Sequence, residues 1–214
     1  MRTAFYHIIQ FLGVCAGIYH YKRLIKPTGL LFWLLVYTFI SELVALYIRL
    51  HYGNNVYIYH LYNPIQYTLI TYAFYLELRK YRFMRYSIFL FWAFALINGI
   101  FWEPFMTKFC SNLSMTKSIL TSLWALLYLN ELFKKVSEHK LADYPLVWIS
   151  VGLLVFNVTN ILGLGLFNLL DSTHRFSAVL QNVRSATNYI LYSTFIGAFY
   201  SAQKTIFYTQ AKED

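Results

Sequence analysis

The amino-acid sequence predicts an all-α fold, a polytopic membrane bundle of seven transmembrane helices. The first observation is composition: 58% of the 214 residues are hydrophobic and only 13% are charged, about half the charged fraction of an ordinary soluble domain. The second is that apolar stretches of about 20 residues, enough to cross a hydrocarbon layer of about 30 Å, recur along the chain. The third is that basic residues gather in alternate connections between these stretches. We therefore expect most of the surface to face a lipid bilayer.

Turn and capping signals separate the stretches in order. Lys26-Pro27-Thr28-Gly29 ends the first helix and begins the second, and Gly53-Asn54-Asn55 predicts a tight turn before the third. Asp143-Tyr144-Pro145 predicts an N-cap and a first-turn proline for the sixth helix, and Asp171-Ser172-Thr173 predicts a cap for the seventh. No linker is long enough to separate domains, so residues 1–214 are expected to form a single transmembrane domain. The expected spans are residues 3–21, 29–50, 56–78, 84–102, 113–133, 145–169 and 177–202.

The distribution of positive charge predicts the orientation. A net charge of +9 would suggest nucleic acid as the partner of a soluble chain, but these basic residues lie in short connections, so no nucleic-acid partner is expected. The positive-inside rule places the N-terminus outside and the C-terminus in the cytoplasm, and the expected location is the bacterial cytoplasmic (inner) membrane. One set of connections holds 12 of the 18 basic residues, namely Lys22, Arg23, Lys26, Arg79, Lys80, Arg82, Arg85, Lys134, Lys135, Lys140, Lys204 and Lys212, and the opposite side holds Arg2, Lys108, Lys117 and Arg175.

Two segments suggest an internal repeat. Residues 63–75 and 188–200 align without gaps, so that Asn63 meets Asn188 and Tyr67 meets Tyr192. Both segments also share an Ala-Phe-Tyr triplet. The two helices have the same expected orientation, so the repeat would be parallel: three helices, a linker helix and three helices. Chance identity among Tyr- and Phe-rich helices is the alternative.

This three-plus-one-plus-three plan resembles the sugar-transporting SWEET proteins, the vitamin-precursor carriers of the PnuC type and the microbial rhodopsins. The resemblance covers the chain only as topology, and no family motif is matched, so no residue roles follow from it. The comparison with rhodopsins fails on chemistry. Retinal needs a lysine near the middle of the seventh span, whereas Lys204 lies at its cytoplasmic end.

Polar residues gather at one depth, in the outer half of several expected spans. His60, Asn63, Tyr67 and Thr71 follow i, i+3, i+7 and i+11, which places them on one stripe of a helix. Ionised side chains inside a membrane cost at least about 2.5–3.5 kcal/mol and mark functional sites by default. The candidate ligand-binding residues are Glu42, His60, Asn63, Gln66, Asn157, Asn160, Arg184 and Asn188.

Structural roles compete with binding at each of these positions. A single Asn or Gln in a helix bundle is often held only by an interhelical hydrogen bond worth about 0.6–2 kcal/mol. Glu42 and Arg184 have three readings: an ion pair that joins spans two and seven, charged groups lining an outward-facing cavity, or, for Glu42, a protonated carboxyl that couples proton movement. His60, among interfacial tyrosines, is expected to be an interfacial residue rather than a metal ligand.

Three classes of function remain open. The first is a small-solute transporter or binder whose polar site lies in the outer half of the bundle. The second is a seven-helix sensor or accessory module without catalysis of its own, which needs a protein partner. The third is an intramembrane enzyme acting on lipid, with Glu42 or His60 as acid or base. No metal-ligand spacing or cofactor fingerprint is present, so no metal and no cofactor are expected.

Overall fold

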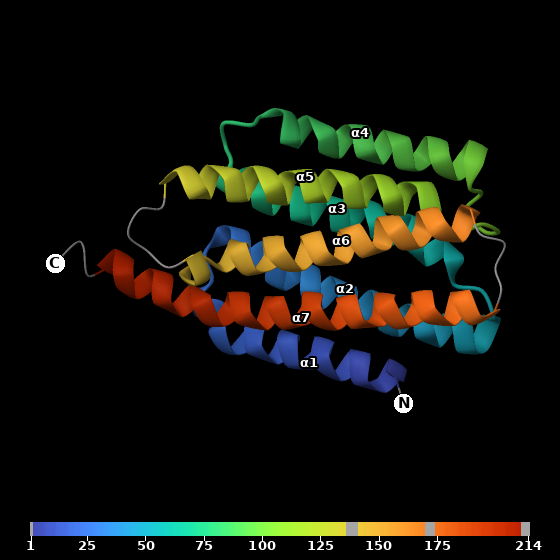
Figure 1. Cartoon of the computed structure of the whole chain (residues 1–214), viewed down its shortest axis with the longest axis horizontal. Coiled ribbons are helices and arrows are strands. Elements are labelled where there is room, and N and C mark those ends of the chain that lie inside the picture. The colour runs from blue at the N-terminus through green and yellow to red at the C-terminus, as the bar shows by residue number, and fades with distance from the viewer. Residues whose placement is uncertain (1, 136–140, 170–173, 211–214) are drawn as a thin grey trace.

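The computed structural model describes residues 2–135, 141–169 and 174–210, and every regular element in these ranges is helical (Figure 1). The all-α prediction is therefore confirmed, and each expected span coincides with one α-helix. The largest difference is at the last helix, which ends at residue 210 rather than near 202. The α-helices are α1 Arg2–His20, α2 Lys26–Tyr52, α3 Val56–Glu77, α4 Phe83–Ile97, α5 Ser111–Lys135, α6 Pro145–Leu169 and α7 His174–Gln210. Short turns are η1 Tyr21–Arg23, the π-helical turn η2 Asn98–Trp102 that continues α4, and η3 Leu141–Asp143.

Glycine and proline set the helix boundaries largely as the sequence predicts. Gly53 adopts a left-handed conformation with φ of 76°, and its N–H donates to the Arg49 carbonyl at 3.1 Å, which ends α2. Pro27 lies in the first turn of α2 and Pro145 begins α6. Asp143 is part of η3, so Tyr144 rather than Asp143 precedes α6. The expected cap at residues 171–173 lies outside the described residues.

Six of the helices form a ring. In the order α1, α2, α3, α5, α6 and α7, each helix packs against the next, and α7 packs against α1. Helix α4 lies outside this ring, against α3, at one edge of the bundle (Figure 1). One end of the bundle carries the turn at residues 53–55 and the connection 103–110, and we call it the turn end. The other carries residues 21–25, 78–82 and 141–144 with most of the described basic residues, and we call it the basic end.

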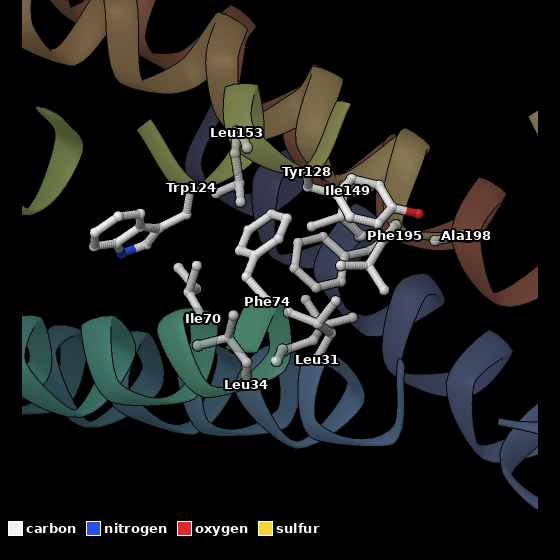
Figure 2. Close-up of a cluster of buried hydrophobic side chains, with 14 of the residues drawn as sticks. Leu31, Leu34, Ile70, Phe74, Trp124, Tyr128, Ile149, Leu153, Phe195 and Ala198 are labelled. Atoms are coloured by element: carbon white, nitrogen blue, oxygen red, sulfur yellow. The ribbon is translucent and has the colours of Figure 1, made fainter. Parts of the chain in front are cut away.

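Aromatic and aliphatic side chains fill the half of the ring near the basic end. Figure 2 shows this cluster, in which Phe74 of α3 and Tyr128 of α5 have ring centroids 5.9 Å apart. Phe74 and Phe199 are fully buried. Helices α6 and α7 approach closely here, because a Cβ added at Gly152 would lie 2.1 Å from the Thr194 hydroxyl. The cluster includes Leu31, Leu34, Ile70, Phe74, Trp124, Tyr128, Ile149, Leu153, Phe195 and Ala198.

Three of the described helices are long and apolar enough to cross a membrane: residues 26–52, 83–102 and 145–165. Large apolar side chains also point outward, with Leu50 74% and Phe89 69% exposed. These features support a membrane protein. Helix α3 does not reach the same hydropathy because His60, Asn63 and Gln66 lie on it. These side chains are buried inside the bundle, so their polarity does not belong to the outer surface of α3.

Candidate functional site

A buried ammonium group is the centre of the polar half of the ring. Lys117 lies in the second turn of α5 and is only 5% exposed. Its Nζ donates to Asn63 Oδ1 at 2.8 Å and to Gln66 Oε1 on α3. The same nitrogen lies 5.7 Å from the centroid of the Tyr62 ring. Two neutral amide oxygens and an aromatic face therefore replace part of the water shell that the cation would have in solution.

The sequence assigns Lys117 to the outer side but does not predict that its side chain is buried inside the bundle. The reason is visible in its neighbours along α5, where Ser114, Ser118 and Thr121 are also buried. With Lys117 they form one polar face at helical spacing. That face points into the bundle, so the long lysine stem carries its charge toward α3 and not toward water.

Tyr62 extends the network from α3 to α2. Gln66 Nε2 donates to the Tyr62 hydroxyl at 3.0 Å, and that hydroxyl lies 3.2 Å from Thr38 Oγ1. The Tyr37 ring stacks on Tyr62 with centroids 5.7 Å apart. A continuous chain of polar contacts thus runs from Lys117 on α5 across α3 to Thr38 on α2.

Glu42 lies one helical turn beyond Thr38 on α2 and is half-buried. Its carboxyl lies near the Tyr6 hydroxyl on α1 and the Tyr62 hydroxyl on α3. The Tyr6 hydroxyl lies 3.2 Å from that of Tyr192 on α7 and accepts from Gln10 Nε2 at 3.2 Å. The interior of the turn half therefore holds polar groups from α1, α2, α3, α5 and α7.

Asn157 and Asn160 join α6 to α5. Asn157 Nδ2 donates to Thr121 Oγ1 at 2.9 Å. Asn160 Nδ2 donates to Ser118 Oγ at 2.9 Å and to Ser114 Oγ at 3.2 Å. Both amides thus hydrogen-bond across a helix seam, which is the structural role that competes with ligand binding at these two positions.

His60 and Asn63 connect α3 to the 103–110 segment. The His60 ring is 4% exposed, and its Nε2 lies 3.0 Å from the Lys108 carbonyl, so Nε2 carries the proton. The ring packs edge-on against Phe105 with centroids 5.0 Å apart. Asn63 Nδ2 donates to the Tyr59 carbonyl at 2.9 Å and to the buried Cys110 Sγ at 3.2 Å. This leaves Asn63 Oδ1 directed at Lys117.

The buried carboxylate of Glu103 organises the connection from α4 to α5. Asn98 Nδ2 donates to Glu103 Oε2 at 2.8 Å, and the Asn112 backbone N–H donates to Glu103 Oε1 at 3.0 Å. Glu103 is 8% exposed and lies at the N-terminus of α5, where the helix dipole favours an anion. Glu103 therefore caps the N-terminus of α5, which is a structural role.

The other predicted residues are only partly placed. Asn188 is half-buried on α7. Arg184 lies on α7, but its side chain is outside the described residues, so the expected Glu42–Arg184 ion pair stays untested. Sequence reasoning missed Lys117, Tyr62 and Gln10. The signal for Lys117 was present: it lies four residues inside an expected span, between Ser114 and Thr121.

Among the described residues, no group of three or more His, Cys, Asp or Glu side chains could hold a metal ion. Cys15 and Cys110 are both free thiols. No protein-family model, no curated protein and no solved structure matches this chain. The polar residues of the turn half are therefore the basis for assigning a function.

Proposed function

We propose that this chain is a seven-span integral membrane protein of the bacterial cytoplasmic membrane that binds a small polar solute in the outer half of its bundle, and that it acts as a transporter or binder of that solute. The N-terminus lies outside and the C-terminus lies in the cytoplasm. The observation that carries the proposal is the buried Lys117 ammonium, held by Asn63 and Gln66.

The energetics support a functional charge at this position. Burying an ionised group away from water is costly unless hydrogen bonds and nearby charges compensate for its lost hydration. Hydrogen bonds from a charged donor, such as those from Lys117 to Asn63 and Gln66, each contribute about 1.5–3 kcal/mol, whereas an apolar residue of similar length would carry no desolvation cost. A lysine kept inside the bundle among amide and hydroxyl groups therefore supports a polar binding site in the turn half.

The chemistry of the cluster favours a solute with an anionic group. An ammonium pairs with carboxylate or phosphate oxygens through charge-assisted hydrogen bonds, and the amides of Asn63 and Gln66 offer both donors and acceptors. Because Lys117, Asn63 and Gln66 are nearly fully buried, the solute replaces some of their mutual hydrogen bonds when it enters. The Tyr62 hydroxyl, between Gln66 and Thr38, supplies a further polar contact.

The order of the helices supports the repeat that transport would use. The neighbouring pairs α1–α2, α2–α3 and α3–α5 recur as α5–α6, α6–α7 and α7–α1. This is the pattern of two parallel three-helix units around a shared axis, with α4 as the linker outside. Movement of one such unit against the other is a known basis of alternating access.

Ligand binding by gently extracted wild type, Lys117→Gln and Lys108→Gln tests the proposal. Native mass spectrometry detects co-purified small solutes, and a thermal-shift panel of carboxylates, amino acids and neutral sugars identifies the class. We expect wild type to bind an anionic or zwitterionic compound, and Lys117→Gln to lose about 10- to 100-fold in affinity, the worth of one charge-assisted hydrogen bond. Lys108, exposed at the turn end, is the matched control.

A second variant separates binding from folding. Glu42→Gln keeps the size of the side chain and should change the pH dependence of binding while leaving the melting temperature nearly unchanged. If Lys117→Gln and Glu42→Gln bind the same compounds as wild type, or if no compound binds wild type, the polar cluster is structural. The accessory or sensor class would then be favoured.

A further inference from the structure

A groove runs along the outer surface of α2 and α3 at the basic end of the bundle. Its volume is about 500 Å³. It lies where α2 begins and α3 ends, so the two antiparallel helices form its walls. Residues of three segments line it: Tyr21, Leu24 and Ile25 before α2; Lys26, Gly29, Leu30 and Trp33 on α2; and Tyr72, Leu76 and Arg79 on and after α3.

The floor of the groove is open at Gly29, which has no side chain. A Cβ added at Gly29 would meet no heavy atom within 4 Å. Aromatic residues form its sides, and the Trp33 indole N–H donates to the Tyr21 hydroxyl at 3.3 Å. Trp33 is 52% and Tyr72 is 41% exposed. In a membrane protein, such exposed aromatic and aliphatic surface faces the bilayer.

Two cations lie at the end of this apolar groove. Lys26 and Arg79 both line it and are both exposed. Within the described part of the chain neither forms an ion pair, since the ion pairs found there join Lys80 and Lys134 to Glu131. Their charge is therefore available to an anion outside the protein.

We propose that this groove binds one anionic phospholipid. The phosphate lies between Lys26 and Arg79, and an acyl chain lies along Gly29, Leu30 and Leu76. The Trp33–Tyr21 pair packs beside the glycerol region, where amphipathic aromatic side chains are favoured. A small soluble anion would use the two cations but not the apolar length of the groove, which is why a lipid is the occupant. Basic pockets between helices at the cytoplasmic side are suited to such headgroups.

Native mass spectrometry from nanodiscs tests the site, with phosphatidylglycerol and phosphatidylcholine of identical acyl chains as the competing probes. We expect wild type to retain phosphatidylglycerol preferentially. Each cation near an anionic headgroup contributes about fivefold in affinity, so Lys26→Gln/Arg79→Gln should reduce the preference roughly 30-fold. The matched control is Lys22→Gln/Arg85→Gln, two exposed cations at the same end that do not line the groove.

A steric variant tests the acyl-chain part independently of charge. Gly29→Phe should place a ring in the groove and reduce the retention of both lipids, because a Cβ at this position meets no heavy atom within 4 Å. Gly163→Phe is its control, since a Cβ there also meets nothing within 4 Å and the residue lies elsewhere. Equal loss in the Lys22/Arg85 control would indicate only a diffuse attraction of the basic end. Unchanged retention in Gly29→Phe would show that the lipid does not use the groove. Either result overturns the proposal.

Discussion

The two halves of the bundle are built from the same helices but bury different chemistry. On α3, Phe74 lies in the basic half among aromatic and aliphatic side chains, whereas Gln66, two turns away, binds an ammonium in the turn half. On α5, Tyr128 packs in the first environment and Lys117 lies in the second. One continuous helix therefore contributes to two cores, and the change occurs within about three turns.

This difference separates what holds the bundle together from what is able to rearrange. In a membrane, helices associate mainly through close packing, and each interhelical hydrogen bond adds little. The basic half has the larger packed cluster, including the close approach at Gly152. The turn half combines interhelical hydrogen bonds with a smaller apolar cluster around Tyr67, Phe91 and Leu113. We infer that stability is concentrated in the basic half and adaptability in the turn half.

Truncation of Phe74 is the strongest test of that comparison. Phe74 is fully buried, so Phe74→Ala leaves a cavity and should lower the free energy of unfolding by about 3 kcal/mol or more. Phe89 on α4 is 69% exposed, and Phe89→Ala should change it by less than about 1 kcal/mol. Denaturant-induced unfolding in mixed micelles measures both. A loss at Phe74 no larger than that at Phe89 would contradict a packed basic half.

The sequence predicts the helices well and the site only in part. Apolar length and turn signals such as Gly53 locate the helices because both act locally along the chain. The contact of Lys117 with Asn63 and Gln66 depends on α5 lying beside α3, and neighbour order around a bundle is not a local property. The same limit explains why His60, expected at the interface, is covered by Phe105 from a later connection.

Asn160 tests the polar half with an intermediate effect. Asn160→Ala removes two hydrogen bonds across the α5–α6 seam and should cost about 1 kcal/mol. The loss is limited because Ser118 Oγ already donates to the Ser114 carbonyl and remains satisfied. Thr159→Ala is the control, since that hydroxyl bonds only within α6, to the Val155 carbonyl at 2.9 Å.

Stability and solute retention of Asn160→Ala together decide its role. If retention by native mass spectrometry is unchanged while unfolding occurs at lower denaturant, Asn160 belongs to the seam. If retention falls while stability matches that of Thr159→Ala, Asn160 belongs to the ligand site, and the polar half extends from Lys117 to α6.

The smallest effect is expected at the rim of the basic half, where Glu131 pairs with Lys80 at 2.5 Å and with Lys134 at 3.2 Å. Both lysines are exposed, and exposed ion pairs contribute little and are screened by salt. The hydrogen bond to Glu131 raises the pKa of Lys80 above its ordinary value of 10.5. Because the folded state favours the charged lysine, the stability that this ion pair contributes is complete below pH 10.5 and is lost as the pH rises through the higher folded-state pKa.

Lys80→Gln should therefore lower the melting temperature slightly at neutral pH, and by more than Lys134→Gln, with both shifts vanishing at high salt. A larger shift for Lys134→Gln, or one insensitive to salt, would mean that the rim of the basic half stabilises the bundle by packing and not by charge.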